Sequence, residues 1–292
     1  GNKVSNCTIT AERDVAGIVG VASNLKEFEN NSVDDVTIKY HSVKSYKTAS
    51  EIVSERVAIT VPSSNTFNNV EIILDAMSVN NVKDALDSGL DVTLMQDVSG
   101  AATDSNGYGA TGVYVNGSTL DGNGNTISVS NANGTWDSAV GTNGGTIKNL
   151  NIEGAFRGIF TGGLNSDLYL DNVYVDKVCY TFNADGTYAD TYSLIVTNST
   201  FNGWTSYSDI FKEVSFTNCN FGKGTGGYTY AYMRPYNDST FTNCVFEENY
   251  LFDSSKATST FVNCYVGNTL ITQENVTALL GSSASNIVVH NN

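Results

Sequence analysis

The stretch "FTNCVF" (residues 241–246) has close copies on either side, "FTNCNF" at 216–221 and "FVNCYV" at 261–266. The relaxed pattern has apolar residues at positions one and six, Asn or Asp at position three, and a small or apolar residue at position four. It recurs as "VSNCTI" (4–9), "VDDVTI" (33–38), "FNNVEI" (67–72), "IKNLNI" (147–152), "LDNVYV" (170–175) and "VTNSTF" (196–201). From Asn149 to Asn291 the third-position residues lie 20 to 28 residues apart. This period, without helical spacing, predicts a solenoid with one coil per repeat.

The six-residue unit also predicts the shape of each coil. Cys219 and Phe221 have the parity of one strand face, whereas Phe216 would lie on the opposite face of a straight strand. Because all three are apolar, the chain must bend between them. Asn and Asp tolerate the left-handed conformation that such a corner requires. We therefore expect a right-handed parallel β-helix, an all-β fold, with Asn side chains stacked in a ladder at one corner.

Two segments without the repeat predict capping helices. In "SVNNVKDALDSGLDVTLMQDV" (78–98), Val79, Val82 and Leu86 have helical spacing and Gly89 ends the helix before a strand. A short amphipathic helix of this kind can cover the open end of a β-helix. "TQENVTALLGSS" (272–283) predicts a second cap, and "STLDGNGNTISVS" (118–130) an early coil. We place a domain boundary near residue 77, with N-terminal β-helical repeats in 1–77 and a capped β-helix in 78–292.

Charge and hydropathy exclude several classes of partner. The chain of 292 residues has 15 Lys and Arg against 30 Asp and Glu, a net charge of −15. Without a basic stripe it is not expected to bind nucleic acid or an anionic membrane surface, and polyuronates would need a bridging divalent cation. No stretch approaches the roughly 20 apolar residues of a membrane span, and no signal peptide is evident. We expect the chain to be part of a longer protein.

Four of the five cysteines, Cys7, Cys219, Cys244 and Cys264, occupy the fourth position of the unit. Val, Leu and Ser fill the same position in other copies, which indicates a small buried side chain. A metal site is disfavoured because no His lies nearby, and parallel neighbouring side chains give poor disulfide geometry. We predict free structural thiols, with Cys179 also buried.

Two resemblances accompany these patterns. "SVNNVKDALDSGLDVTLMQDVSG" followed by "LDGNGNTI" resembles the opening of bacterial pectin-lyase-like β-helix proteins, and "VAGIVG" (15–20) between "NCTIT" and "NSVDDVTI" resembles GLUG-type repeats of surface proteins. The resemblances imply a secreted or cell-surface bacterial protein. They do not fix an activity, because pectin-lyase-like folds include lyases, hydrolases, esterases, adhesins and tailspikes.

Polysaccharide lyases of the pectin-lyase-like class use an Arg or Lys base and carboxylate-bound Ca²⁺. The candidate bases are Arg157 in "GAFRGIF" and Arg234 in "YAYMRPYND", and the nearby carboxylates are Asp167, Asp171 and Asp176. No tight Asp-x-x-x-Asp cluster adjoins either arginine, and each could instead stack on aromatic residues. We expect no cofactor, with Ca²⁺ required only under this lyase hypothesis.

Other catalytic constellations are not complete in the sequence. The Asp34–Asp35 pair lacks the partner motifs of the hydrolases with this fold, and Asp35 is itself a corner residue. The two histidines, His41 and His290, lie near opposite ends of the chain, and no nucleophile elbow is present.

Aromatic residues provide the strongest candidate for a binding site. In "GGYTYAYMRPY" (226–236), Tyr228, Tyr230 and Tyr232 alternate, as on one face of a strand. "NGWTSYSD" (202–209) places Trp204 and Tyr207 on an expected loop. Together with Asp209 and Arg234 these rings would form a platform on which sugars stack. The alternative is that the tyrosines pack inward or under a loop.

The sequence thus favours an extracellular β-helix module that binds carbohydrate or mediates adhesion without catalysis. A polysaccharide lyase or glycoside hydrolase acting on a cell-wall or dietary polysaccharide is the alternative from another class. A structural spacer within a larger surface protein is the third. The expected partner is a polysaccharide or other glycan, and the oligomeric state is left open.

Overall fold

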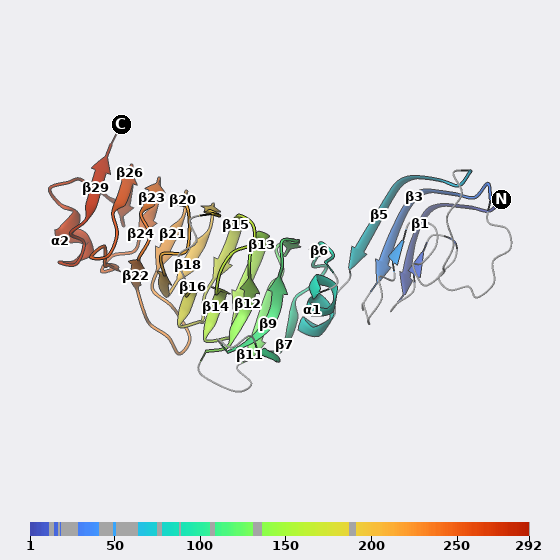
Figure 1. Ribbon diagram of the computed structural model, residues 1–292, viewed down its shortest axis with the longest axis horizontal. Helices are drawn as coiled ribbons and strands as arrows, with labels where there is room; N and C mark the ends of the chain where they lie inside the picture. The colour runs from blue at the N-terminus through green and yellow to red at the C-terminus, as the bar shows by residue number, and fades with distance from the viewer. Residues whose placement is uncertain are drawn as a thin grey trace.

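The computed structural model is a parallel β-helix of about nine turns with short capping helices, which confirms the predicted fold class (Figure 1). The structure describes residues 1–11, 15–16, 18, 29–40, 49–50, 64–74, 78–87, 89–105, 109–130, 136–186 and 191–291. His41, two of the four arginines and half of "VAGIVG" lie outside these residues. The domain boundary near residue 77 stays a prediction.

The first coils form a parallel sheet of their own. The sheet has the order β1-β3-β5, and a two-stranded pair lies beside it. Its strands are β1 (Lys3–Ala11), β3 (Ser32–Tyr40) and β5 (Thr66–Leu74), and the pair is β2 (Val15–Ala16) with β4 (Ala49–Ser50). The register places corner unit on corner unit, with Cys7 opposite Val36 and Val36 opposite Val70.

The main β-helix has two stacked sheets. The larger one contains the corner units and pairs each coil with the next in the order β15-β17-β20-β23-β26-β29 before the corner and β15-β18-β21-β24-β27 after it. Its strands are β6 (Val92–Thr93), β7 (Val98–Ala101), β10 (Thr119–Asp121), β11 (Thr126–Ser130), β13 (Gly145–Glu153), β15 (Leu168–Val175), β17 (Leu194–Thr197), β18 (Thr200–Asn202), β20 (Val214–Thr217), β21 (Asn220–Gly222), β23 (Ser239–Thr242), β24 (Val245–Phe246), β26 (Ser259–Val262), β27 (Tyr265–Val266), β28 (Thr269–Leu270) and β29 (Ile287–His290).

The second sheet closes the coils and has the order β25-β22-β19-β16-β14-β12-β9-β8. Its strands are β8 (Asp104–Ser105), β9 (Ala110–Val115), β12 (Ser138–Thr142), β14 (Arg157–Thr161), β16 (Tyr180–Ala184), β19 (Trp204–Tyr207), β22 (Tyr232–Pro235) and β25 (Leu251–Phe252). Alternate residues of these short strands point into the core and to the outer face, although every residue of β12 and β14 is buried. The outward rows of this sheet carry the candidate site.

The corner residues of the nine complete units all adopt the left-handed conformation. Their φ angles lie between 48° and 55° at Asn6, Asp35, Asn69, Asn149, Asn172, Asn198, Asn218, Asn243 and Asn263. Because this conformation costs an ordinary L-residue about 1–2 kcal/mol, the repeated Asn or Asp is explained by backbone geometry. The bend turns both flanking strands inward, and Phe216, Cys219 and Phe221 are all buried.

The corner side chains form the expected ladder, although it is not made of Asn alone. Asn172 donates to Asn149 at 3.0 Å and Asn218 donates to Asn198 at 3.3 Å. Asn198, however, donates to the carboxylate of Asp171 at 2.8 Å. The ladder is exposed, so each bond adds modestly to stability.

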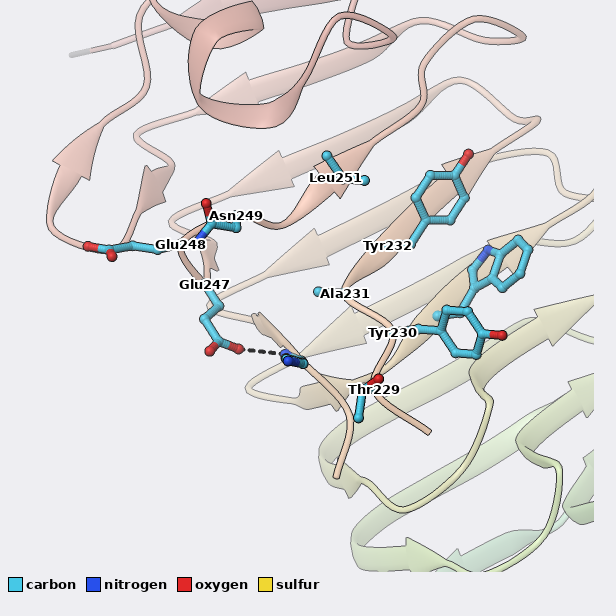
Figure 2. A pocket seen from close by; sticks show the side chains of 10 residues that line it. Thr229, Tyr230, Ala231, Tyr232, Glu247, Glu248, Asn249 and Leu251 are labelled. Carbon is cyan, nitrogen blue, oxygen red and sulfur yellow. Dashed lines mark hydrogen bonds between the residues drawn. The ribbon is translucent and has the colours of Figure 1, made fainter. Parts of the chain in front are cut away.

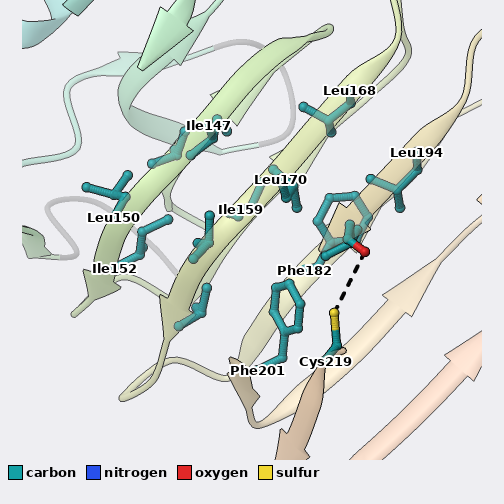
Figure 3. Packing of buried hydrophobic residues seen from close by; sticks show 14 of the residues in the cluster. Ile147, Leu150, Ile152, Ile159, Leu168, Leu170, Phe182, Leu194, Phe201 and Cys219 are labelled. Carbon is teal, nitrogen blue, oxygen red and sulfur yellow. Dashed lines mark hydrogen bonds between the residues drawn. The ribbon is translucent and has the colours of Figure 1, made fainter. Parts of the chain in front are cut away.

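Aromatic and aliphatic side chains fill the interior in columns that follow the corner units (Figure 3). Phe216 and Phe241 stack with ring centroids 5.0 Å apart, and so do Phe221 and Phe246. Earlier coils place Ile147, Leu170 and similar side chains in the same columns. Each such burial contributes about 1.5–3 kcal/mol, so the columns dominate the stability of the β-helix.

The thiol column is buried in the main β-helix, as predicted. The Sγ atoms of Cys219, Cys244 and Cys264 lie 3.3–3.8 Å from carbonyl oxygens of their own and the preceding coil. All five cysteines are free thiols, and Cys179 is buried. The prediction was wrong for Cys7, which is exposed because it lies on the outermost coil.

Both capping helices are present (Figure 1). The first, α1 (Val79–Asp87), buries Val79, Val82, Ala85 and Leu86, and Gly89 ends it with φ 75°. The second, α2 (Val276–Leu280), lies at the C-terminal end, buries its two terminal residues and is followed by Gly281 with φ 99°. The apolar face of each helix therefore packs on the β-helix, as the spacing predicted.

We predict that Asn243→Ala lowers the free energy of unfolding by about 1–2 kcal/mol, because alanine is strained at a left-handed corner. Asn243→Gly should cost less, since glycine adopts this conformation freely, although it too loses the amide bond to Asn218. Urea unfolding followed by circular dichroism compares the two variants. Equal losses for Ala and Gly would show that the backbone conformation is not the reason for Asn.

We predict that one thiol per chain reacts rapidly with a water-soluble disulfide reagent under native conditions and that all five react after unfolding. Cys7 is exposed, whereas the other four are buried, and burial raises the pKa of Cys179 to about 11. Cys7→Ser serves as the control and should abolish the rapid phase. A rapid phase that survives this substitution would contradict the buried thiol column.

Candidate functional site

The outer face of the eight-stranded sheet carries two rows of side chains that the register brings together. The first row consists of Arg157, Tyr180, Trp204, Tyr232 and Leu251 on successive strands from β14 to β25. The second row, two or three residues further along each strand, consists of Phe160, Asn183, Ser206 and Arg234. The register shifts between Tyr180 and Phe182, where β16 pairs with β19.

Seven rings of this face form a continuous aromatic strip. Tyr180 stacks on Trp204 with ring centroids 4.6 Å apart, and Trp204 contacts Tyr230 at 5.6 Å and Tyr232 at 5.1 Å. At the other end Trp136 lies 6.0 Å from Tyr180. The strip comprises Trp136, Phe156, Tyr180, Trp204, Tyr228, Tyr230 and Tyr232.

Exposure is uneven along the aromatic strip. Trp136 is 50% exposed and Tyr230 is 46% exposed, and the adjoining Leu251 is 52% exposed. Trp204, in contrast, meets Tyr180 in a stacked contact and Tyr232 in an edge contact at 87°. Trp136 and Tyr230 therefore offer ring faces to a ligand, whereas Trp204 forms the floor between them.

A hollow of about 650 Å³ adjoins Tyr230 (Figure 2). Tyr230 and Tyr232 form one side, Glu247, Glu248 and Asn249 form the other, and Leu251 lies above them in this view. Glu247 accepts a hydrogen bond from the backbone N–H of Lys223, which fixes this carboxylate. The hollow combines an apolar wall with hydrogen-bonding groups, the composition typical of ligand sites.

A second hollow, of about 330 Å³, lies over the second row, and we call it the Arg234 hollow. Its polar groups belong to Asn183, Asp185, Ser206, Ser208 and Arg234. Its aromatic walls are Trp136, Tyr180 and Tyr236. Trp136 contributes both to this hollow and to the aromatic strip, so the hollow and the strip form one continuous surface.

Arg234 lies between two rings in the Arg234 hollow. Its guanidinium carbon is 5.5 Å from the centroid of Trp204 and 5.3 Å from that of Tyr236. The lysines Lys148 and Lys177 are paired with Asp121 and Glu153 at 3.3 and 2.6 Å, but Arg234 makes no hydrogen bond or ion pair within the described part of the chain. Its guanidinium is stacked between these two rings and lines the hollow, and its charge also acts on the nearby carboxylate of Asp253.

Arg157 is poorly placed to act as a base on a polysaccharide. It is only 3% exposed, its guanidinium carbon lies 3.8 Å from the centroid of Phe160, and its Nη2 donates to the carbonyl oxygen of Trp136. Burial lowers its pKa to about 10, against the opposing effect of Asp137 and Asp185. The side chain supports Trp136 from beneath, in agreement with the aromatic-stacking alternative.

The structure changes the place of several residues expected in the platform. Tyr207 was expected on an outer loop, and this was wrong, because it is 0% exposed and its hydroxyl bonds with Ser239 at 2.8 Å. Trp204 begins a strand instead of lying on a loop. Tyr228 and Tyr230 precede β22, so only Tyr232 is on a strand. Asp209 is exposed but lines neither hollow.

Three rings of the strip were not found from the sequence, namely Trp136, Phe156 and Tyr180. Trp136 and Phe156 lie just before β12 and β14, and Tyr180 is the first residue of β16. Their shared position, at or just before the start of a second-sheet strand, is the signal that could have identified them. It becomes visible only after the coils are aligned in space.

The three carboxylates considered for Ca²⁺ are all engaged in hydrogen bonds. Asp167 accepts from the backbone of Ser193, and Asp171 accepts from Thr197 and Asn198. Within the described residues, no group of three or more His, Cys, Asp or Glu side chains is arranged to hold a metal ion.

Asp176 fixes the segment that contains Tyr228 and Tyr230. Its carboxylate accepts hydrogen bonds from the backbone and hydroxyl of Thr225 at 2.9 and 2.7 Å, across 49 residues. Burial acts to raise the pKa of Asp176, but the bonds from Thr225, Lys177 and Tyr174 outweigh it and the pKa lies below its ordinary value. Asp176 therefore anchors residues 223–231 over the sheet.

We predict that Asp176→Asn increases amide hydrogen exchange in residues 223–231, because the charge-assisted bonds to Thr225 are lost. Since the pKa of Asp176 is lowered in the folded state, the hydrogen bonds from Thr225 to Asp176 in the wild-type protein should persist below the ordinary Asp pKa of about 3.9. They should be lost as the pH falls through the lowered pKa. Hydrogen exchange measured by mass spectrometry over a pH series tests both the effect of Asp176→Asn and the pH dependence of the wild-type protein. Unchanged protection in Asp176→Asn would show that Thr225 is held by other contacts.

Comparison of the chain with family models, with curated proteins and with solved structures finds no match. No helix in the described part of the chain is long and apolar enough to cross a membrane. The site must therefore be interpreted from its own geometry.

Proposed function

We propose that this chain is a carbohydrate-binding module, acting in adhesion as part of a larger secreted or cell-surface bacterial protein. The observation that carries the proposal is the aromatic strip, in which Trp136 and Tyr230 offer ring faces beside hollows of 330 and 650 Å³. Sugars present flat C–H faces that stack on such rings and hydroxyl groups that bond the surrounding polar side chains. The resemblance to pectin-lyase-like and GLUG-type proteins supports the secreted or cell-surface location.

Non-covalent binding is favoured over cleavage by the environment of the two candidate bases. Arg157 is sealed beneath Trp136, and Arg234 is stacked between two rings. A lyase base needs direct access to the proton that it removes. Arg157 lacks that access, and the stacked guanidinium of Arg234 is suited to donate hydrogen bonds.

The first test incubates the protein with neutral and uronate polysaccharides, with and without Ca²⁺, and measures both binding and chain length. We expect retention of at least one neutral polysaccharide in affinity electrophoresis and no shortened products in mass spectrometry. Unsaturated uronide products would overturn the proposal in favour of a lyase with Arg234 as base. A protein that neither binds nor cleaves any polymer would leave the spacer interpretation.

We predict that Tyr230→Ala weakens binding of the retained polysaccharide by about five- to tenfold, because one stacking contact is lost. Tyr169→Ala is a matched control, since Tyr169 is similarly exposed, at 42%, but lies on the other sheet. Isothermal titration calorimetry compares the two variants. Equal effects of the two substitutions would remove the strip from the binding site.

A further inference from the structure

We infer that the Arg234 hollow selects an uncharged sugar by clamping neighbouring hydroxyl groups between Arg234 as hydrogen-bond donor and Asp185 as acceptor. The inference rests on the proposed function and deepens it by naming the class of sugar and the two residues that determine specificity. It is carried by the arrangement of opposite charges within one hollow.

Arg234 and Asp185 line the same hollow but do not pair with each other. The guanidinium of Arg234 is fixed by Trp204 and Tyr236, and its side chain makes no hydrogen bond or ion pair in the described residues. Asp185 is exposed, and its carboxylate also makes no hydrogen bond there. Because Arg234 and Asp185 do not bond each other, both side chains can form hydrogen bonds to one bound ligand.

Their charges decide which ligand fits. A carboxylate on the sugar would be attracted by Arg234 but repelled by Asp185 and by the net charge of −15. An ammonium group on the sugar would be attracted by Asp185 but repelled by Arg234. A hydroxyl group both donates and accepts hydrogen bonds, so two neighbouring hydroxyls can bond Arg234 and Asp185. Because hydroxyls are neutral, neither side chain repels them. The walls formed by Trp136, Tyr180 and Tyr236 suit the apolar face of the same sugar.

The polar atoms around the pair suit a hydroxylated ligand. Ser208 lines the hollow, and its Oγ has no hydrogen-bond partner in the described part of the chain. Asn183 donates its side-chain N–H to the carbonyl oxygen of Ser206 at 3.2 Å, which leaves its amide oxygen as an acceptor. These neutral groups add donors and acceptors without favouring an ion of either sign.

The test uses hexasaccharides of glucan, mannan and galactan, each in three forms that differ only at C6: hydroxyl, carboxylate and amine. We expect the wild-type protein to bind a neutral form more tightly than its two charged forms, with little dependence on salt. Asp185→Asn should reduce the discrimination against the carboxylate form, and Arg234→Met the discrimination against the amine form, each by roughly fivefold. Arg234→Lys should weaken neutral binding but keep the discrimination, because the charge is retained and the planar fork is lost.

Matched control variants remove one positive and one negative charge at residues outside the Arg234 hollow. Lys212→Met and Glu213→Gln alter exposed neighbours that line neither hollow and should leave all preferences unchanged. Tighter wild-type binding of a carboxylate form would overturn the inference and make Arg234 a simple anion receptor, while carbohydrate binding would stand. Failure of every saccharide, in this series and in the polysaccharide panel, would instead overturn the proposed function.

Discussion

The left-handed corner is the constraint on which the rest of the structure depends. Because Asn or Asp can hold φ near 50° where other residues are strained, each coil turns at the same point and presents both flanking strands to the interior. The columns of Phe and the thiol column follow from this turn, since their positions are counted from it. Stacking then fixes the register, with Phe216 opposite Phe241 and Phe241 opposite Phe261.

A fixed corner also explains why the repeat length can vary without disturbing the core. Asn198 and Asn218 are 20 residues apart, whereas Asn218 and Asn243 are 25 apart. The longer coil accommodates residues 223–231 between β21 and β22, where Asp176 holds them through Thr225. This segment contains Tyr228 and Tyr230. Irregular spacing therefore marks the segment that the core does not need and that the candidate site uses.

The sequence predicted the parts of the fold that are encoded locally. The corner residues, the inward columns and both capping helices follow from six-residue units and helical spacing. The residues of the second sheet that face outward could not be predicted in the same way, because its strands share no sequence motif. On β19, Trp204 belongs to the aromatic strip whereas Tyr207 is buried in the core, but only a known strand boundary and register reveal which residues face outward. For the same reason, Trp136 and Tyr180 were not predicted to belong to the aromatic strip.

The stacking of coils also limits which aromatic residues can bind a ligand. Neighbouring strands are about 4.8 Å apart, close to the separation of stacked rings, so neighbouring rings in one outward row contact each other. Tyr180 and Trp204 do so at 4.6 Å, which occupies the faces that a sugar would need. A ring in the turn that precedes a strand escapes this stacking, as Trp136 and Tyr230 do with about half of their surfaces exposed. In this β-helix the regular rows therefore form a floor of packed rings, and under the proposed function the ligand would contact the rings placed just outside them.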